Sequence, residues 1–293
     1  MANSNKVYQI VTDKIIEILE RGAIPWKRPW RGGASGLPRN IVSKKPYRGI
    51  NCFLLAVTGE FMGYSSPYWL TYKQAQELGG YVKKGEKSTL VIFWKLWEKQ
   101  DQETGQTDEI PVLRYYQVFN VDQCQDVTIP SDPIPGQKDL DFEPIAACEN
   151  VVENMPNRPE ILHSTSPKAY YSPSRDVVHM PTQGKFESAE YYYNALFHEL
   201  THSTGHEKRL HRRDSDRIAA FGDPEYSKEE LVAEMGAAFL CSYCEIDNLT
   251  IENSAAYIQG WLKVLRDDNK MVIQAAAQAQ KAADYILVKG GRW

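Results

Sequence analysis

Residues 198–202 read His198-Glu199-Leu200-Thr201-His202, an H-E-x-x-H pentapeptide inside a stretch with helical periodicity. Residues four apart project from one face of a helix, so both imidazoles can reach a single metal ion. Glu199 lies beside them, where a carboxylate can take a proton from an attacking water and deliver one to a leaving amine. The pentapeptide therefore predicts a Zn²⁺-dependent hydrolytic site of the peptidase type, with Mn²⁺ as another possible divalent ion.

A catalytic zinc ion takes three protein ligands and keeps one position open, so a further ligand is expected outside the pentapeptide. The helix expected next, over Ser227–Glu245, offers glutamates for the His₂Glu set of thermolysin-like enzymes. We expect Glu229 to be this ligand, because it shares a helical face with the small residues Ala233, Gly236 and Ala237. Small side chains on that face would allow the two helices to approach closely.

Three alternatives to this third ligand stay open. Glu230 and Glu234 are spaced i to i+4, so one could bind the metal while the other orients a ligand histidine. His206 follows His202 by four residues, although the helix could end before it. The metzincin spacing does not apply, because Lys208 stands where that pattern needs its third histidine. The bland interpretation of the glutamates is a solvated helix face.

Composition describes an ordinary globular chain of 293 residues, 42% hydrophobic and 25% charged. No apolar run approaches the roughly 20 residues that span a bilayer, and the N-terminus lacks an apolar signal core, so we expect a cytoplasmic protein without membrane contact. The five cysteines are an odd number, which favours reduced thiols over a disulfide framework. Cys241 and Cys244 form a lone C-x-x-C in a helix, where buried thiols are the better interpretation.

The net charge of −4 conceals a strong asymmetry. Residues 1–95 hold 15 Lys and Arg against 6 Asp and Glu, a net charge of +9, and the remainder holds 19 against 32, a net charge of −13. Single-stranded nucleic acid is bound by cationic grooves with aromatic faces on which bases stack. Such residues cluster in this basic third, and the candidates for DNA binding are Trp26, Lys27, Arg28, Trp30, Arg31, Arg39, Lys44, Lys45, Tyr47, Arg48, Lys83, Lys84 and Lys87.

A proline-rich stretch divides the chain into two expected domains. We place a linker at 128–140, after a mixed α/β DNA-binding domain at 1–127 and before a mainly helical domain with a small sheet at 141–293. The fold class is therefore α+β. The periodicities predict these helices and strands: helices over 4–21, 51–58, 71–78, 144–154, 188–206, 227–245, 254–266 and 268–287, and strands over 89–95, 113–121, 169–171 and 176–180.

Substrates of such metal sites usually lie along an edge strand, and residues 170–173 with 176–181 are the expected edge here.

Several long motifs together resemble the ArdC-type antirestriction proteins of conjugative plasmids, whose N-terminal region also occurs in plasmid primases. The resemblance implies a single-stranded-DNA-binding domain, a zincin-like metalloprotease domain, and protection of incoming plasmid DNA from host restriction. The strings that carry it are Ile24-Pro25-Trp26, Pro38-Arg39-Asn40, Pro46 to Asn51, Trp69-Leu70-Thr71, Gly85-Glu86-Lys87, His198 to His206, Arg209-Leu210 and Glu229 to Glu234.

Two hypotheses compete at this point. In the first, DNA recruits a protease that cuts an unknown protein, such as a host restriction protein or a DNA-bound protein. In the second, the chain coats DNA as a shield, and its metal site is structural or vestigial. The intact Glu199 favours the protease, because a structural site needs no general base.

Overall fold

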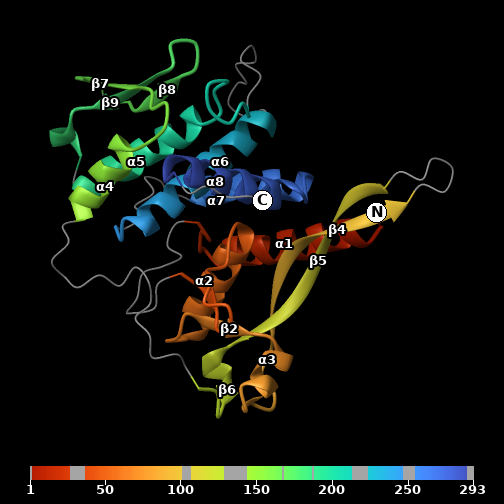
Figure 1. The fold of residues 1–293 in the computed structure, drawn as a ribbon. Coiled ribbons are helices and arrows are strands. Elements are labelled where there is room, and N and C mark those ends of the chain that lie inside the picture. Colours follow the sequence, from red (N-terminus) through yellow and green to blue (C-terminus); the bar gives the residue numbers. More distant parts are fainter. Residues whose placement is uncertain are drawn as a thin grey trace.

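The computed structural model describes residues 2–26, 37–100, 107–128, 144–166, 168–186, 188–212, 224–246 and 255–288. Figure 1 shows helices and strands in both the N-terminal and the C-terminal half of the described chain, which confirms the α+β expectation. The described residues form an N-terminal module, up to residue 128, and a C-terminal module, from residue 144. Residues 129–143, which include nearly all of the expected linker, lie outside the described residues.

The N-terminal module is built on a long hairpin, β4 and β5, whose strands pair antiparallel from Thr89 opposite Val118 to Gln100 opposite Thr107. The sheet order is β1-β2-β5-β4, and β3 pairs with β6 in a separate ribbon. A capping box between Thr71 and Gln74 starts α3. The elements are α1 (Ala2–Glu20), β1 (Arg39–Asn40), α2 (Ile50–Met62), β2 (Tyr68–Leu70), α3 (Tyr72–Glu77), β3 (Tyr81–Val82), β4 (Thr89–Gln100), β5 (Thr107–Asn120) and β6 (Cys124–Gln125).

The C-terminal module places a small sheet against a stack of helices (Figure 1). The sheet order is β7-β9-β8, with β7 parallel and β8 antiparallel to β9. Helix α6 contacts both α5 and α8. The elements are α4 (Pro144–Glu153), β7 (Glu160–Ser164), β8 (Tyr170–Ser172), β9 (Val177–Pro181), α5 (Ala189–Ser203), α6 (Pro224–Tyr243), α7 (Ala255–Asp267) and α8 (Met271–Ile286).

These bounds confirm the predicted helices and correct one prediction about the sheet. Each expected helix is present within a few residues of its predicted ends. Strand β7 was not predicted, and it pairs along the side of β9 that the sequence left open. As a result β9 is the central strand, and only 170–172 of the expected edge lies at an edge of the sheet.

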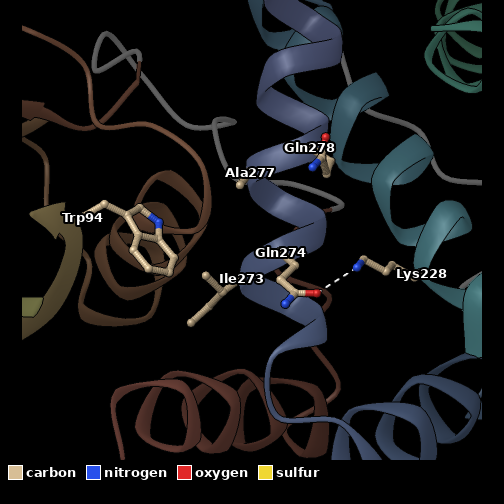
Figure 2. A pocket seen from close by; sticks show the side chains of 6 residues that line it. All are labelled: Trp94, Lys228, Ile273, Gln274, Ala277 and Gln278. Atoms are coloured by element: carbon tan, nitrogen blue, oxygen red, sulfur yellow. Dashed lines mark hydrogen bonds between the residues drawn. The ribbon is translucent and has the colours of Figure 1, made fainter. Parts of the chain in front are cut away.

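The two modules meet along α8. Helix α1 lies against α7 and α8, and α2 contacts α8. Arg48 forms an ion pair with the buried Asp284, and the backbone N–H of Gly49 donates to Gln280 at 3.2 Å. Beside these contacts, Trp94 of β4 faces Ile273 of α8 across a pocket (Figure 2). The two modules are therefore joined by polar contacts and by packing against α8.

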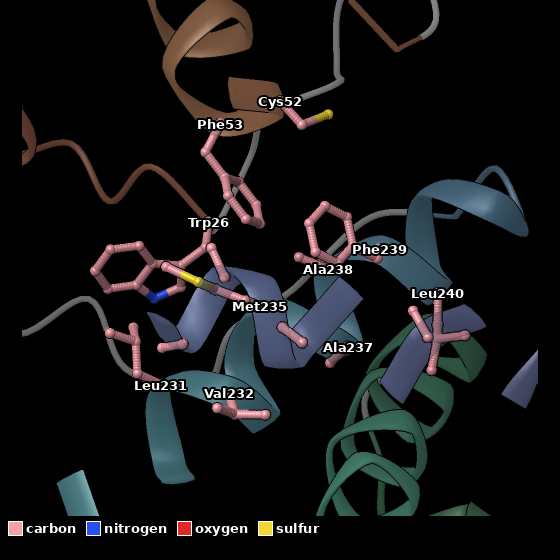
Figure 3. Close-up of a cluster of buried hydrophobic side chains, with 14 of the residues drawn as sticks. Trp26, Cys52, Phe53, Leu231, Val232, Met235, Ala237, Ala238, Phe239 and Leu240 are labelled. Carbon is pink, nitrogen blue, oxygen red and sulfur yellow. The ribbon is translucent and has the colours of Figure 1, made fainter. Parts of the chain in front are cut away.

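One hydrophobic cluster also runs through both modules. Trp26 is fully buried and meets Trp261 of α7 edge-on, with ring centroids 5.8 Å apart. Phe53 of α2 packs on Phe239 of α6 at 4.9 Å, beside Met235 (Figure 3). Burying one such side chain stabilises a fold by about 1.5–3 kcal/mol, so these contacts hold the modules together.

Candidate metal centre

The pentapeptide lies in α5, and α6 crosses that helix at very short range. A Cβ atom on Gly236 would lie 2.4 Å from Cγ2 and 2.7 Å from Oγ1 of Thr201, closer than side chains pack. Thr201 is fully buried and donates its hydroxyl to the carbonyl oxygen of Phe197 at 2.7 Å. Only glycine fits at the crossing, as expected for a small-residue face on α6. The close approach brings the first turns of α6 over the two histidines.

Three side chains converge at this crossing. The Nε2 atoms of His198 and His202 are 3.1 Å apart. Glu230 lies over both, with Oε1 3.3 Å from Nε2 of His202 and Oε2 3.5 Å from Nε2 of His198. All three ligand atoms lie within 4.8 Å of one another. Ligands bound tetrahedrally to zinc at about 2.0–2.2 Å are roughly 3.4 Å apart, so this donor set fits a divalent ion.

Glu229, the expected ligand, faces the other nitrogen of His202. Its Oε1 lies 3.4 Å from Nδ1 of that histidine. Arg212 holds the carboxylate from behind, donating to Oε1 at 2.7 Å and to Oε2 at 3.1 Å. The same guanidinium donates to the hydroxyl of Thr204 at 2.7 Å. The geometry thus places Glu230 rather than Glu229 at the shared face of the histidines, and Glu229 in the position that orients one of them.

The remaining candidates of this site lie around the cluster. Glu199 is buried, and its charge acts on both histidines. The charge of Glu234 contributes to raising the pKa of His198. His206 lies beyond the end of α5, where its Nδ1 accepts from the N–H of Lys208 at 3.2 Å. His206 therefore does not join the group of converging ligand atoms.

The electrostatic potential at the cluster is negative, because several carboxylates surround the histidines. Burial by itself lowers the pKa of His202, but the carboxylates of Glu229 and Glu230 outweigh it and raise the pKa to about 9. Burial likewise lowers the pKa of His198, and Glu230 again reverses the direction. The pKa of Glu230 is lowered, because the two histidines outweigh the effect of its burial. Such a potential stabilises positive charge between these side chains, as a divalent cation would supply.

A buried ion pair fixes the end of α5, and sequence reasoning missed it. The side chain of Arg209 is fully buried and is paired with Asp176 in the turn between β8 and β9. Its Nε donates to the carbonyl of Ser203, at the last residue of α5, at 2.7 Å, and one Nη donates to the hydroxyl of Tyr171 at 3.1 Å. Burial alone raises the pKa of Asp176, but Arg209 and Tyr171 outweigh it and lower the pKa to about 2. The network ties the metal-site helix to the sheet.

The DNA-binding candidates separate into several groups. Trp26 and Arg39 are buried, so Trp26 packs in the core and has no free face for base stacking, contrary to our expectation. Tyr47 is half-buried, and Arg48 reaches across to Asp284. Lysines on two turns are exposed, namely Lys44, Lys45, Lys83, Lys84 and Lys87. The others, Lys27, Arg28, Trp30 and Arg31, lie outside the described residues.

The hairpin presents aromatic side chains that we did not single out as DNA-binding candidates. Trp94, Tyr115 and Tyr116 are each about half exposed, at 50%, 46% and 54%. Phe93 stacks on Tyr116 with ring centroids 4.3 Å apart, and its cross-strand partner Arg114 is exposed. The available signal was aromatic residues at consecutive positions of a strand, because period-two alternation places them on opposite faces, and Tyr115 and Tyr116 show that both faces are partly exposed here.

No helix among the described residues is long and apolar enough to cross a membrane.

Comparisons with known proteins agree with the two modules. Residues 5–119 match the N-terminal domain of the anti-restriction factor ArdC, and residues 148–278 match a zincin-like metallopeptidase. The metal-free crystal structure of the antirestriction ArdC protein from plasmid R388 is 40% identical, covers 97% of this chain and 99% of that chain, and gives a TM-score of 0.76. The Mn(II)-bound structure is 39% identical, covers 96% and 97%, and gives 0.75.

Three further relatives differ in length. The uncharacterized protein y4eC of Sinorhizobium fredii is 35% identical over 96% of this chain and 91% of its own length. Two DNA primases TraC of Escherichia coli are 33% and 34% identical over 96% of this chain. The chain spans only 27% and 20% of those primases. Together with the converging ligand atoms, the Mn(II)-bound relative and the zincin-like match indicate a divalent-metal site.

Proposed function

The chain belongs to the ArdC family of antirestriction proteins, and on this basis we propose that it is a metal-dependent peptidase that binds single-stranded DNA and protects plasmid DNA entering a new cell. The observation that carries the peptidase proposal is the convergence of His198, His202 and Glu230 next to the buried Glu199. A structural metal site needs no such acid–base residue.

Each residue then has a distinct role. His198, His202 and Glu230 hold the ion, for which we favour Zn²⁺ while Mn²⁺ suits the same ligands. When bound, the ion activates water and polarises a scissile carbonyl. Glu199 takes the proton of the attacking water and delivers one to the leaving amine. Glu229 keeps Nδ1 of His202 oriented.

Two neighbouring features support the peptidase proposal, one for binding the peptide and one for orienting a metal ligand. Among the described strands, β8 lies at an edge of the sheet and contacts α5, so an extended peptide could pair with the side of β8 that faces away from β9. Arg212 fixes the carboxylate of Glu229 and bonds to the backbone carbonyl of Thr201 at 3.0 Å, which ties the oriented histidine to the helix. The substrate that we propose for the site is a protein, for example a host restriction protein or a DNA-bound protein.

DNA binding is supported by the exposed lysines and by the aromatic hairpin. Cations on turns follow phosphates, and half-exposed rings offer faces on which bases stack. Replacing Lys83, Lys84 and Lys87 together with alanine should weaken binding of a single-stranded oligonucleotide. The slope of log affinity against log salt should fall by about 2, since each phosphate contact contributes about 0.7. An unchanged slope would remove these lysines from the interface.

The Glu199→Gln variant tests the peptidase proposal. It keeps the three metal ligands, so its metal content should match the wild type, while protection of a restriction-sensitive plasmid in a conjugation assay should be lost. A His202→Ala variant, which loses a ligand, should lose both. Full protection by Glu199→Gln would instead support the DNA-coating shield.

A further inference from the structure

A pocket of about 360 Å³ lies where the two modules meet. This volume falls within the range of about 300–1,000 Å³ that is usual for small-molecule sites. Figure 2 shows α8 between Trp94 of β4 on one side and Lys228 of α6 on the other. The six residues that line it are Trp94, Lys228, Ile273, Gln274, Ala277 and Gln278.

Trp94 offers a fixed aromatic face to this pocket. Its side chain is 50% exposed, although it sits beside a well-packed helix. The indole meets the ring of Tyr8 of α1 in a T-shaped contact, with ring centroids 6.4 Å apart, and Lys270 lies 5.9 Å over the ring of Tyr8. The pocket therefore contains an indole that is positioned by its neighbours but not covered by them. Stacking of a base on such a face is worth about 1–3 kcal/mol.

The opposite wall carries polar groups suited to a nucleotide. Lys228 donates to the side-chain oxygen of Gln274 at 2.8 Å, which uses one of its three N–H donors (Figure 2). The amides of Gln274 and Gln278 carry both donors and acceptors, as the edge of a base requires. None of the six lining residues is acidic, so in the described part of the chain the wall does not repel a phosphate. An aromatic face, two amides and a cation together match a base attached to a phosphate.

We propose that this pocket binds one nucleotide of a single-stranded DNA, with its base on Trp94, the base edge at Gln274 and Gln278, and its phosphate at Lys228. The proposal rests on the DNA binding proposed above and extends the DNA path from the N-terminal module onto α8 and α6. Lys228 immediately precedes Glu229 and Glu230 in α6. Successive helical residues point about 100° apart, so one turn of α6 presents the lysine to the pocket and Glu230 to the metal cluster.

Fluorescence anisotropy with a labelled 15-nucleotide oligothymidine tests the pocket. Trp94→Ala should weaken binding by roughly 5- to 150-fold, which is the stacking energy converted to affinity. Trp94→Phe should recover most of the loss, and Gln278→Glu should weaken binding through its charge. Tyr72→Ala removes an aromatic residue of α3 that is 54% exposed and lies outside the pocket lining, so it should bind as the wild type does.

The outcomes separate this proposal from DNA binding itself. A wild type that does not bind the oligonucleotide overturns both. A wild type that binds, with Trp94→Ala and Gln278→Glu equally tight, overturns the pocket and leaves DNA binding intact. If thymidine monophosphate competes at the same nucleotide concentration, the ligand of the pocket is a free nucleotide, and the proposal that it binds single-stranded DNA is overturned.

A second measurement tests the pocket without any substitution, so that it applies even if Trp94→Ala folds poorly. In the wild type, an oligonucleotide carrying 5-bromodeoxyuridine should crosslink under ultraviolet light to Trp94, as located by mass spectrometry. Crosslinks that occur only at other residues overturn the proposal.

Discussion

Replacing Gly236 with alanine should destabilise the protein although alanine is the better helix former. In an exposed helix the change would stabilise by about 0.5–1 kcal/mol. Here the new Cβ would meet Thr201 at 2.4 and 2.7 Å, so one helix must shift. Overpacking of this kind costs about 1–3 kcal/mol, and the net loss should be about 1–2 kcal/mol. At roughly 2–4 °C per kcal/mol, the melting temperature should fall by about 2–8 °C.

A matched control exists in α7. Gly260 is also a helical glycine, but it is exposed and a Cβ there would meet nothing within 4 Å. Gly260→Ala should therefore raise the melting temperature slightly. Combining Gly236→Ala with Thr201→Ala removes the two closest clashing atoms and should recover stability beyond the sum of the single changes.

The same substitution should weaken metal binding, because Glu230 lies six residues from Gly236, about 9 Å along α6. A helix that is pushed outward carries the carboxylate away from His198 and His202. Thermal denaturation and Zn²⁺ titration calorimetry on the three variants measure both effects. A Gly236→Ala protein that gains as much stability as Gly260→Ala, with unchanged zinc affinity, would refute the argument for a tight helix crossing.

Three further predictions concern the metal ligands, the buried ion pair of Asp176 and Arg209, and removal of the metal. Glu230→Gln should lower zinc affinity more than Glu229→Gln does. For Glu229→Gln we expect a loss of about 10- to 100-fold, because an orienting carboxylate is removed. If chelator competition gives the reverse order, the two glutamates have each other's role. Asp176→Asn leaves Arg209 buried without its partner and should cost about 3 kcal/mol in urea denaturation. Because the folded-state pKa of Asp176 is lowered to about 2, this difference should be complete above pH 4 and shrink as the pH falls from 4 towards 2, and a gap independent of pH would contradict it. Removing zinc with EDTA should lower the melting temperature of the wild type, since a ligand at 100 times its Kd stabilises by about 2.7 kcal/mol, and should leave that of His202→Ala unchanged.

The helices of the C-terminal module could be predicted from sequence because their signals are local. Periodic apolar residues and the pentapeptide lie within single elements, and α5 to α8 appear where these patterns placed them. Strand β7 carries no such pattern, since four of its five residues are exposed. Its existence depends on pairing with β9, which no local rule reports.

The differences at individual residues between the expectation and the structure have the same origin in tertiary contacts. Glu229 and Glu230 differ by about 100° around α6, and the sequence does not determine which of the two faces α5. The difference follows from Arg212, which holds Glu229 against Nδ1 of His202, so that Glu230 reaches Nε2 of both histidines. Likewise the cations after Trp26 made this residue resemble a stacking platform, whereas its partner Trp261 lies far along the chain.

Helix α6 connects the features described above. One face packs on α5 and supplies Glu229 and Glu230 to the histidines, and a second packs on α8, where Lys228 reaches the pocket. A third carries Phe239 onto Phe53 of the N-terminal module. A rigid helix in contact with three partners cannot shift against one of them without disturbing the others. The geometry of the proposed metal ligands is therefore set partly by the packing of the N-terminal module, through the hydrophobic cluster that residues of both modules share.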